Sequence, residues 1–194
     1  IKPIKHGYQK GMSNKLKLTI LVPAHNEEDT IKDCLNSLME MEIPKEVDEV
    51  EYVVIDDRSE DDTRQIAESM GAKVLTKSFR GDYVSAIAEA VAYGVENTND
   101  ELILKCDADI RAPKNALKTI IRHLDGKVGR VSSEVKTRTG KWWIDFLMWL
   151  RDLNYRIAPL GEVPRGAFTL FRRKVVEEVG GFDKSKPTWD TAFD

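Results

Sequence analysis

Short apolar runs alternate with amphipathic segments through the first two thirds of the chain. Leu18–Val22 is an apolar run closed by a proline, as expected of a buried strand, and residues 31–39 then carry apolar side chains at helical spacing. Three more pairs of strand and helix follow, with strands at 52–55, 73–76 and 102–104 and helices at 59–70, 84–95 and 117–124. This alternation predicts parallel β-α-β units covered by helices, with a ligand site at the carboxyl ends of the strands.

Local signals indicate where these helices begin and end. Ser59 and Asp62, three residues apart, resemble a capping box that opens the second helix, and Gly71 is its expected stop signal. Asn26 is the expected cap of the first helix, because acidic residues follow it in the first turn.

The rhythm changes after residue 125. We expect a strand at about 128–135, a long apolar helix at about 141–157, a strand at 167–171 and a short helix ending at Gly180-Gly181. No linker marks a boundary, so the sequence predicts one α/β domain over residues 15–194, with a mostly parallel central sheet and helices on both faces. Residues 1–14 are expected to be an appended tail, joined to a natural initiator methionine at Gly11-Met12.

The composition is that of a folded globular protein. The 194 residues are 41% hydrophobic and 32% charged, which excludes disordered and low-complexity chains. A net charge of -3 gives no positive field, so nucleic acid is not an expected partner. Cys34 and Cys106 lie outside any CxxC pattern, which predicts neither a disulfide nor a zinc site and favours a reducing, cytoplasmic setting. No apolar run approaches the ~18 residues that span a bilayer.

Two carboxylates follow the apolar strand at 102–106. Asp107 and Asp109, with Ala108 between them, are aimed toward one small volume if the strand ends there. Two such charges at ~4 Å repel by about 4 kcal/mol at an effective dielectric of ~20, so holding them together needs a cation or a raised pKa. Oxygen ligands favour Mg²⁺ or Mn²⁺ over zinc. The alternative is an ordinary strand-to-helix turn in which an aspartate serves as a cap.

A second polar group follows the strand at 52–55. The segment 56–63 reads Asp-Asp-Arg-Ser-Glu-Asp-Asp-Thr, and capping the next helix requires only one or two of these side chains. A carboxylate at the end of an internal parallel strand is well placed to accept a hydrogen bond from a base imide or a ribose hydroxyl. Nucleoside recognition would therefore account for the surplus of acids at Asp56 and Asp57.

Taken together, these residues resemble the family 2 glycosyltransferases, which have the GT-A fold. The resemblance runs from residue 18 to residue 194. Residues 21–28 resemble the opening P-x-x-N-E motif, 54–63 the V-D-D-x-S-x-D-x-T motif, 107–109 the metal-binding DxD, and 165–167, 172–173 and 179–183 the region before the catalytic acid. The resemblance implies a GT-A type (Rossmann-like) domain that uses a nucleotide-diphosphate sugar donor and a divalent metal, Mn²⁺ or Mg²⁺, and transfers a hexosyl group with inversion.

The resemblance also assigns roles to residues. It implies that the nucleotide of the donor is bound by Pro23, Ala24, Glu27, Asp56, Asp57, Arg80 and Asp107. Asp107 would reach the ribose or the metal, and Asp109 would ligate the metal. Asp190 would be the catalytic base, and Arg165, Gly166 and Trp189 would lie in the acceptor region. The acceptor itself, a glycan, a lipid or a small molecule, is left open.

The chain departs from the family pattern at two places. Asp82 stands where a basic residue is common, which leaves Arg80 as the nearest cation, and Trp189 replaces the first acid of the expected Glu-Asp pair. The chain also ends sooner than the family pattern does, so a C-terminal segment is expected beyond residue 194. Asp82 and Trp189 leave open a sugar-nucleotide binding module without turnover. A nucleotidyltransferase that releases pyrophosphate also remains open, because it too would need a metal and a nucleotide at such a sheet.

An aromatic stripe at helical spacing, as expected at 141–157, is more typical of a core helix than of a binding site, but two of its tryptophans leave an alternative open. Trp143, Phe146, Leu147 and Leu150 are expected to form its buried face, which leaves Trp142 and Trp149 pointing elsewhere. These two tryptophans suit an acceptor groove, an oligomer interface or a peripheral contact with the inner face of a membrane.

Overall fold

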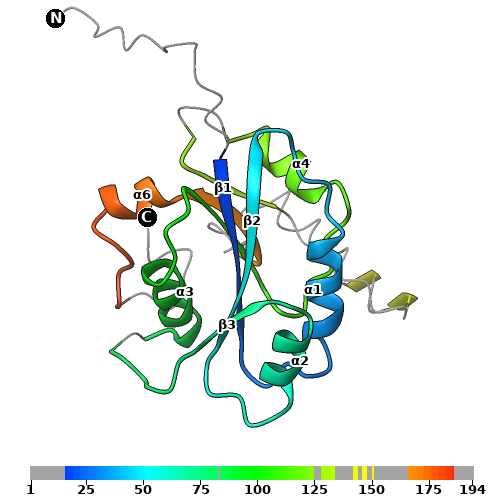
Figure 1. Cartoon of the computed structure of the whole chain (residues 1–194), viewed down its shortest axis with the longest axis vertical. Helices are drawn as coiled ribbons and strands as arrows, with labels where there is room; N and C mark the ends of the chain where they lie inside the picture. The colour runs from blue at the N-terminus through cyan, green and yellow to red at the C-terminus, as the bar shows by residue number, and fades with distance from the viewer. Residues whose placement is uncertain are drawn as a thin grey trace, which may run out of the picture.

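The computed structural model describes residues 16–82, 84–124, 128–133, 142–143, 146–147, 150 and 166–185. Its strands are β1 (Leu16–Ala24), β2 (Val47–Asp56), β3 (Lys73–Thr76), β4 (Leu102–Cys106), β5 (Arg130–Ser132) and β6 (Phe168–Arg172). Its labelled helices are α1 (Ile31–Met39), α2 (Thr63–Ser69), α3 (Ala86–Glu96), α4 (Ala116–Ile121) and α6 (Arg173–Glu178) (Figure 1).

The described strands form one sheet in the order β3-β2-β1-β4-β6-β5. The first four strands in that order are parallel, and β6 pairs antiparallel with both β4 and β5. The chain moves outward from β1 to β3 and then crosses back to β4, so β1 and β4 flank a switch point in the strand order. The predicted α/β domain with a mostly parallel sheet is confirmed.

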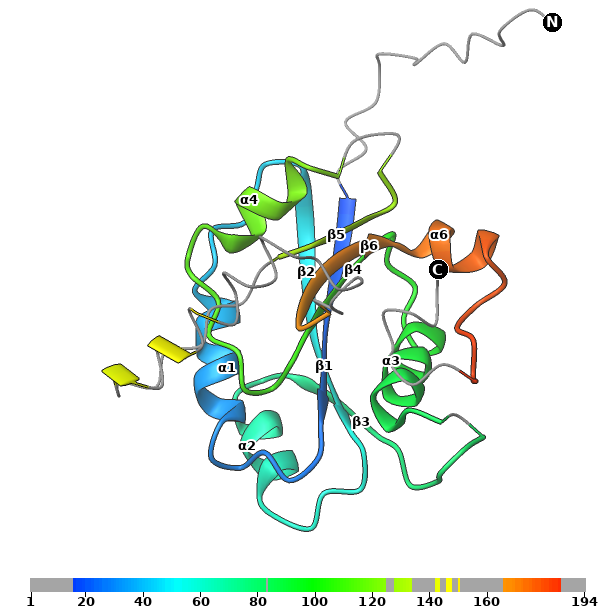
Figure 2. The same cartoon turned by 180° about the vertical axis from the view of Figure 1, so that it is seen from behind.

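Helices cover both faces of the sheet, as expected (Figures 1 and 2). Helices α1, α2 and α4 pack on one face and α3 and α6 on the other. Each face has its own cluster of buried apolar side chains. Successive residues of β1 divide between the two clusters, since Ile20 and Val22 belong to the first and Leu21 to the second. Burial on both faces explains why the parallel strands are nearly continuous apolar runs rather than alternating ones.

Two of the predicted helix caps are wrong. Helix α1 begins after Thr30 and α2 after Asp62, and neither residue makes a side-chain capping bond. The side chains of Asn26 and Ser59 instead accept hydrogen bonds from the backbone of the neighbouring loop, because the ends of β1 and β2 lie side by side. The predicted stop at Gly71 is confirmed, since its φ of +83° is the left-handed conformation that glycine adopts readily.

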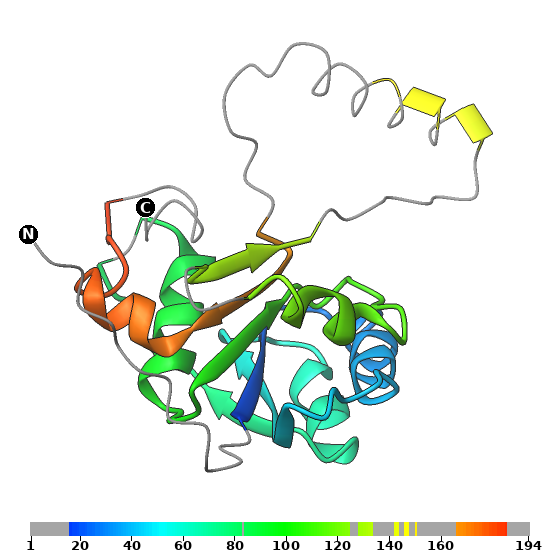
Figure 3. The same cartoon turned by 90° about the horizontal axis from the view of Figure 1, so that it is seen from above.

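The predicted buried face of the long apolar helix is also not observed. The described helical residues 142–143 and 146–147, yellow in Figure 3, lie apart from the sheet. Trp142 is 80% exposed, and Trp143, Phe146 and Leu147 are at least 50% exposed. Helical periodicity places apolar residues on one face of a helix, but it does not provide a surface against which they are buried. Trp149 lies outside the described residues. In the part of the chain that the structure describes, no helix has the length and apolar character needed to cross a membrane.

Candidate functional site

One pocket of about 490 Å³ lies at the carboxyl ends of β1, β2 and β4. We call it the strand-end pocket. It is lined by Pro23, Ala24, His25, Glu27, Asp57, Arg58, Arg80, Ala86, Ile87, Ala90, Asp107, Ala108 and Asp109. The residues predicted to bind donor nucleotide or metal are therefore brought together here, with the exception of Asp56. Parallel strands cause this, because the loops that leave their carboxyl ends all meet at one edge of the sheet.

A larger pocket of about 600 Å³ lies between α4 and the β5–β6 pair. Its described lining contains Arg111 and His123 but no aspartate or glutamate. A site for a divalent cation needs anionic oxygens, so the strand-end pocket is the better candidate even though it is smaller.

The loops after β1 and β2 are fastened to each other by hydrogen bonds that run in both directions. The backbone nitrogen of Asn26 donates to the Ser59 hydroxyl (3.0 Å), while the Asn26 side-chain oxygen accepts from the backbone nitrogen of Glu60 (2.8 Å). The backbone nitrogen of Glu27 donates to the Thr63 hydroxyl (2.7 Å). We call this set of bonds the loop clasp. It explains why polar residues recur at 26–28 and 59–63, and it shows that part of the apparent surplus is structural.

The loop clasp also requires unusual backbone angles. Asn26 has a φ of +55° and Arg58 a φ of +62°, a region that non-glycine residues seldom occupy. Asparagine tolerates it comparatively well, whereas arginine has no such preference. The turn at Arg58 places its guanidinium against the Asp57 carboxylate.

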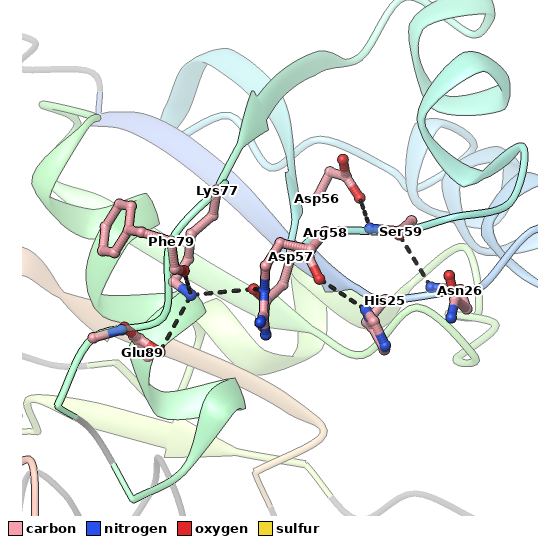
Figure 4. A network of polar contacts seen from close by, with 10 residues as sticks. His25, Asn26, Asp56, Asp57, Arg58, Ser59, Lys77, Phe79 and Glu89 are labelled. Atoms are coloured by element: carbon pink, nitrogen blue, oxygen red, sulfur yellow. Dashed lines mark hydrogen bonds and ion pairs between the residues drawn. The ribbon is translucent and has the colours of Figure 1, made fainter.

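Asp57 is nearly buried and is held by two cations (Figure 4). Its Oδ1 accepts from Arg58 Nε (2.9 Å) and from Lys77 Nζ (3.1 Å), and its backbone carbonyl contacts His25 Nδ1 (2.7 Å). Burial alone raises the pKa of Asp57, but the hydrogen bonds from Arg58 and Lys77 outweigh it and hold the pKa below its ordinary value. Asp57 is therefore an anion across the physiological range.

Lys77 is fully buried, and three oxygens surround its ammonium group: two accept hydrogen bonds from it, and the third, Glu89 Oε2, forms an ion pair without a hydrogen bond. Nζ lies 3.1 Å from Asp57 Oδ1, 2.7 Å from the Phe79 carbonyl and 3.2 Å from Glu89 Oε2. The other oxygen of Glu89, Oε1, accepts from the backbone nitrogen of Gly81. Figure 4 shows this chain of contacts running from the pocket wall to α3.

Asp107 also pairs with a buried lysine. Lys105 sits inside β4, and its Nζ contacts Asp107 Oδ1 and donates to the Gly166 carbonyl (3.0 Å). The sequence predicted that two carboxylates held close together need a cation or a raised pKa, and for Asp107 the chain itself supplies a cation in Lys105. Asp109 is exposed at the pocket.

The two cysteines meet beneath Asp107, although they are far apart in sequence. Cys34 and Cys106 are both buried free thiols that point at the Asp107 carbonyl. The hydrogen bond with Cys34, together with burial, raises the pKa of the Cys106 thiol well above its ordinary value. The thiol of Cys106 therefore stays protonated and is a poor metal ligand, which leaves oxygen donors to face the pocket.

The residues present suit a hard divalent cation whose remaining coordination positions are filled by a bound ligand. Asp107 and Asp109 supply carboxylate oxygens at one end of the pocket, and within the described residues no group of three or more His, Cys, Asp or Glu side chains could hold a metal. Mg²⁺ and Mn²⁺ suit such a donor set, because Mg²⁺ is typically bound by one or two carboxylates together with substrate phosphates and water.

The remaining predicted residues lie elsewhere. Asp56 is buried beside the pocket, and its Oδ1 accepts from the backbone nitrogen of Ser59 (3.0 Å), so it shapes the turn. Gly166 is buried, and its carbonyl meets Lys105. Asp82, which replaces an expected basic residue, forms an exposed ion pair with Lys184 (2.8 Å). Asp190, Arg165 and Trp189 fall outside the described residues.

Sequence reasoning missed Lys77, Glu89 and Lys105. A signal was present for the lysines, because Lys105 interrupts the apolar run of β4 and Lys77 directly follows β3. A lysine inside a strand buried on both faces needs an anion or carbonyl partner. Glu89 gave no comparable signal, since a glutamate in the first turn of a helix is common.

The sequence pattern described as glycosyl transferase family 2 matches residues 19–180, a range that contains every residue lining the strand-end pocket. The chain belongs to glycosyl transferase family 2.

This family 2 domain is similar to named glycosyltransferases. It is 27% identical over 202 residues to the probable glycosyltransferase YdaM of Bacillus subtilis (strain 168), covering 95% of this chain and 47% of the relative. It is 30% identical over 138 residues to 4,4'-diaponeurosporenoate glycosyltransferase of Staphylococcus aureus (strain USA300), covering 69% of this chain and 35% of the relative. The chain spans about half or less of the length of these relatives.

Solved structures share the fold of this family 2 domain. A mannosyltransferase from Pyrobaculum calidifontis in complex with GDP-Man and Mn²⁺ has a TM-score of 0.63 at 23% identity, covering 87% of this chain and 48% of that one. Glucosyl-3-phosphoglycerate synthase from Mycobacterium tuberculosis, in complex with Mn²⁺, UDP-glucose and phosphoglyceric acid, has a TM-score of 0.62 at 23% identity, covering 88% and 61%. At this identity the likeness establishes the GT-A fold.

Proposed function

We propose that this chain is the donor-binding domain of a metal-dependent, inverting glycosyltransferase. It would move a sugar from a nucleotide-diphosphate donor to an acceptor hydroxyl. The observation that carries the proposal is the strand-end pocket, which gathers the predicted nucleotide and metal residues at one edge of the sheet. The complexes of the fold neighbours with GDP-Man or UDP-glucose and Mn²⁺ support the class of donor.

The end of the pocket at His25, Asp57 and Arg58 is the proposed nucleoside end. Asp57 is an anion whose Oδ1 already accepts from Arg58 Nε and Lys77. Among the described residues its other oxygen, Oδ2, has one long contact, 3.5 Å from Arg58 Nη2, so Oδ2 suits the N–H of a base. Pro23 and Ala24 form an apolar wall at this end against which a base can pack.

The end at Asp107 and Asp109 is the proposed phosphate end. A divalent cation bound there would neutralise the donor diphosphate and stabilise its departure. Asp109 is the proposed metal ligand, and Asp107, held by Lys105, would contact the metal or the ribose. Arg80 is exposed and lines the same pocket, and we assign it to the phosphate oxygens of the donor.

We infer from the family resemblance that Asp190 is the general base. Inverting transfer needs a carboxylate on the face opposite the leaving diphosphate, to take the proton of the acceptor hydroxyl. Replacing Asp190 by Asn should leave donor and metal affinity as in the parent but slow transfer by about 10² to 10⁴. Transfer at the parent rate would remove Asp190 from the mechanism and turn attention to Asp183 and Asp194.

Product analysis distinguishes the proposed reaction from the two other functions. A glycosyltransferase releases nucleoside diphosphate and forms a glycoside, a nucleotidyltransferase releases pyrophosphate, and a binding module forms no product. The starting measurement is thermal unfolding with UDP-glucose and GDP-mannose, each with and without Mn²⁺. A donor at 100 times its Kd should stabilise the fold by about 2.7 kcal/mol. If neither donor raises the melting temperature in the presence of Mn²⁺, the proposal is contradicted for these two donors.

A further inference from the structure

The buried pair of Lys77 and Glu89 lies beside the strand-end pocket without lining it. Lys77 is 0% exposed and Glu89 4% exposed, and their side chains approach to 3.2 Å. Burying two charges is costly, and an apolar pair of similar volume often gives equal or greater stability. Stability alone is therefore a weak reason for this pair, and its contacts suggest another.

Both residues hold the segment between β3 and α3. Lys77 Nζ donates to the Phe79 carbonyl (2.7 Å), and Glu89 Oε1 accepts from the backbone nitrogen of Gly81. Arg80, which is exposed and lines the pocket, lies between these two attachment points. An exposed arginine on an unattached loop would sample many positions, whereas here its neighbours on both sides are tied to buried charges.

The same pair links the loop to the nucleoside end of the pocket. Lys77 Nζ also donates to Asp57 Oδ1 (3.1 Å), so one ammonium group contacts both the carboxylate that follows β2 and the loop that follows β3. Glu89 balances the charge of Lys77, and Arg58 balances that of Asp57, in a row of alternating charges from α3 to the pocket. Asp57 keeps its ion pair with Arg58 when Lys77 is removed, so the segment that carries Arg80 is the part of the pocket that depends on the Lys77–Glu89 pair.

The close approach of Glu89 to Gly81 leaves no room for a side chain at residue 81. A Cβ added to Gly81 would overlap Glu89 Oε1, so a larger residue cannot occupy this position without moving the loop or the glutamate. The hydrogen bond from Gly81 to Glu89 depends on that approach.

We propose that Lys77 and Glu89 are positioning residues that hold the 77–81 loop so that Arg80 faces the diphosphate of the bound donor. The inference rests on the proposed function, since it assigns Arg80 to the donor. The pair touches neither donor nor metal and acts through Arg80. It fixes Arg80 before the donor arrives, which reduces the ordering that binding would otherwise require.

The main test replaces both buried charges together, as Lys77→Met with Glu89→Met, so that no unpaired charge remains. The double variant should unfold cooperatively like the parent but bind UDP-glucose or GDP-mannose with Mn²⁺ about tenfold to a hundredfold more weakly. Hydrogen exchange at the Gly81 amide, which needs no ligand, should become faster because its acceptor is lost. The matched control is Lys73→Met with Glu51→Met, a partly exposed lysine–glutamate pair 2.9 Å apart that joins β3 to β2, and it should change affinity by less than about twofold.

A second measurement separates positioning from a general loss of structure. In an Arg80→Ala background the double replacement should weaken donor binding by less than about threefold, because the residue it positions is already absent. A full loss in that background would show that the pair acts by another route and would overturn the proposal. Parent affinity or unchanged Gly81 exchange in the folded double variant would overturn it as well.

Gly81→Ala keeps every charge and provides the answer if the double variant does not fold. Its added methyl group should displace the loop and weaken donor binding to a similar extent, and parent affinity would refute the positioning role. The two proposals fail differently. A parent chain that binds none of the donors refutes the proposed function and this inference with it. If the parent chain binds donor and the variants bind it with the same affinity, the inference alone is refuted.

Discussion

The two ends of the strand-end pocket use the same device with different results. At each end a carboxylate that follows a strand pairs with a buried lysine: Asp57 with Lys77 and Asp107 with Lys105. The Asp57 side chain is 8% exposed and that of Asp107 is 35% exposed. A lysine thus fixes the carboxylate at both ends, but only the phosphate end leaves it open to solvent.

The balance of charge also differs between the two ends. At the nucleoside end Arg58 and Lys77 match Asp57 and Glu89, whereas at the phosphate end Lys105 pairs with Asp107 and Asp109 adds a second, exposed carboxylate. Exposed carboxylate oxygens can bind a metal ion, while a nearly buried carboxylate that is paired with cations suits the uncharged base of a nucleotide. The pocket therefore combines two environments within one fold, and substitutions at the two ends should affect different properties.

The largest effect is expected at the phosphate end. Asp109→Asn keeps the shape of the side chain but removes its charge, and it should weaken metal-dependent donor affinity by about 2–5 kcal/mol, measured by calorimetry with Mn²⁺. Asp33→Asn is the matched control, because Asp33 is an exposed carboxylate outside the pocket. Unchanged affinity in Asp109→Asn, or no metal dependence in the parent, would rule out the assigned ligand.

A smaller effect of another kind is expected at the nucleoside end. Asp57→Asn retains an oxygen that can accept from Lys77 but no longer presents a carboxylate to the base. The preference between UDP and GDP should shrink by about 1–3 kcal/mol, while the dependence on Mn²⁺ persists. A competition assay with the two diphosphates measures both quantities. A variant that discriminates like the parent would transfer base recognition to another part of the pocket.

The loop clasp should affect stability more than binding. Asn26→Ala removes the bond to Glu60 and places alanine at a φ of +55°, so it should cost about 1–2 kcal/mol in urea unfolding. Asn26→Gly loses the same bond without the steric penalty and should cost less. Equal losses in the two variants would show that backbone strain at this turn is unimportant.

The smallest expected effect is the dependence of stability on pH, because opposing causes act on Asp57. Its pKa is lowered in the folded state, so its contribution to stability is present above the unfolded pKa, ordinarily about 3.9, and is lost as the pH falls through the lower folded value. Unfolding free energy should therefore decrease below about pH 4, and less steeply in Asp57→Asn. Parallel curves for the two proteins would place the acid sensitivity at other carboxyl groups.

Much of the architecture could be predicted because its determinants are local. Strand β3 lies at the predicted residues 73–76, and β4 begins at the predicted Leu102. The acids after β2 and β4 could be assigned to one site because parallel strands deliver their carboxyl ends to one edge. The capping predictions at Asn26 and Ser59 failed for the opposite reason, since each side chain found a partner on a neighbouring loop that helix chemistry does not anticipate.

The sequence by itself determined the order of elements, the two-sided burial of the sheet and the carboxylates that face the strand-end pocket, because hydrophobic periodicity and turn chemistry act over a few residues. Only the tertiary structure decided the partners of the buried charges. Lys105 donates to the carbonyl of Gly166, 61 residues later in the chain, and Lys77 donates to Asp57, 20 residues earlier. A buried lysine must find an oxygen, but which oxygen it finds depends on how the strands pair and how α3 packs, and no local pattern contains that information.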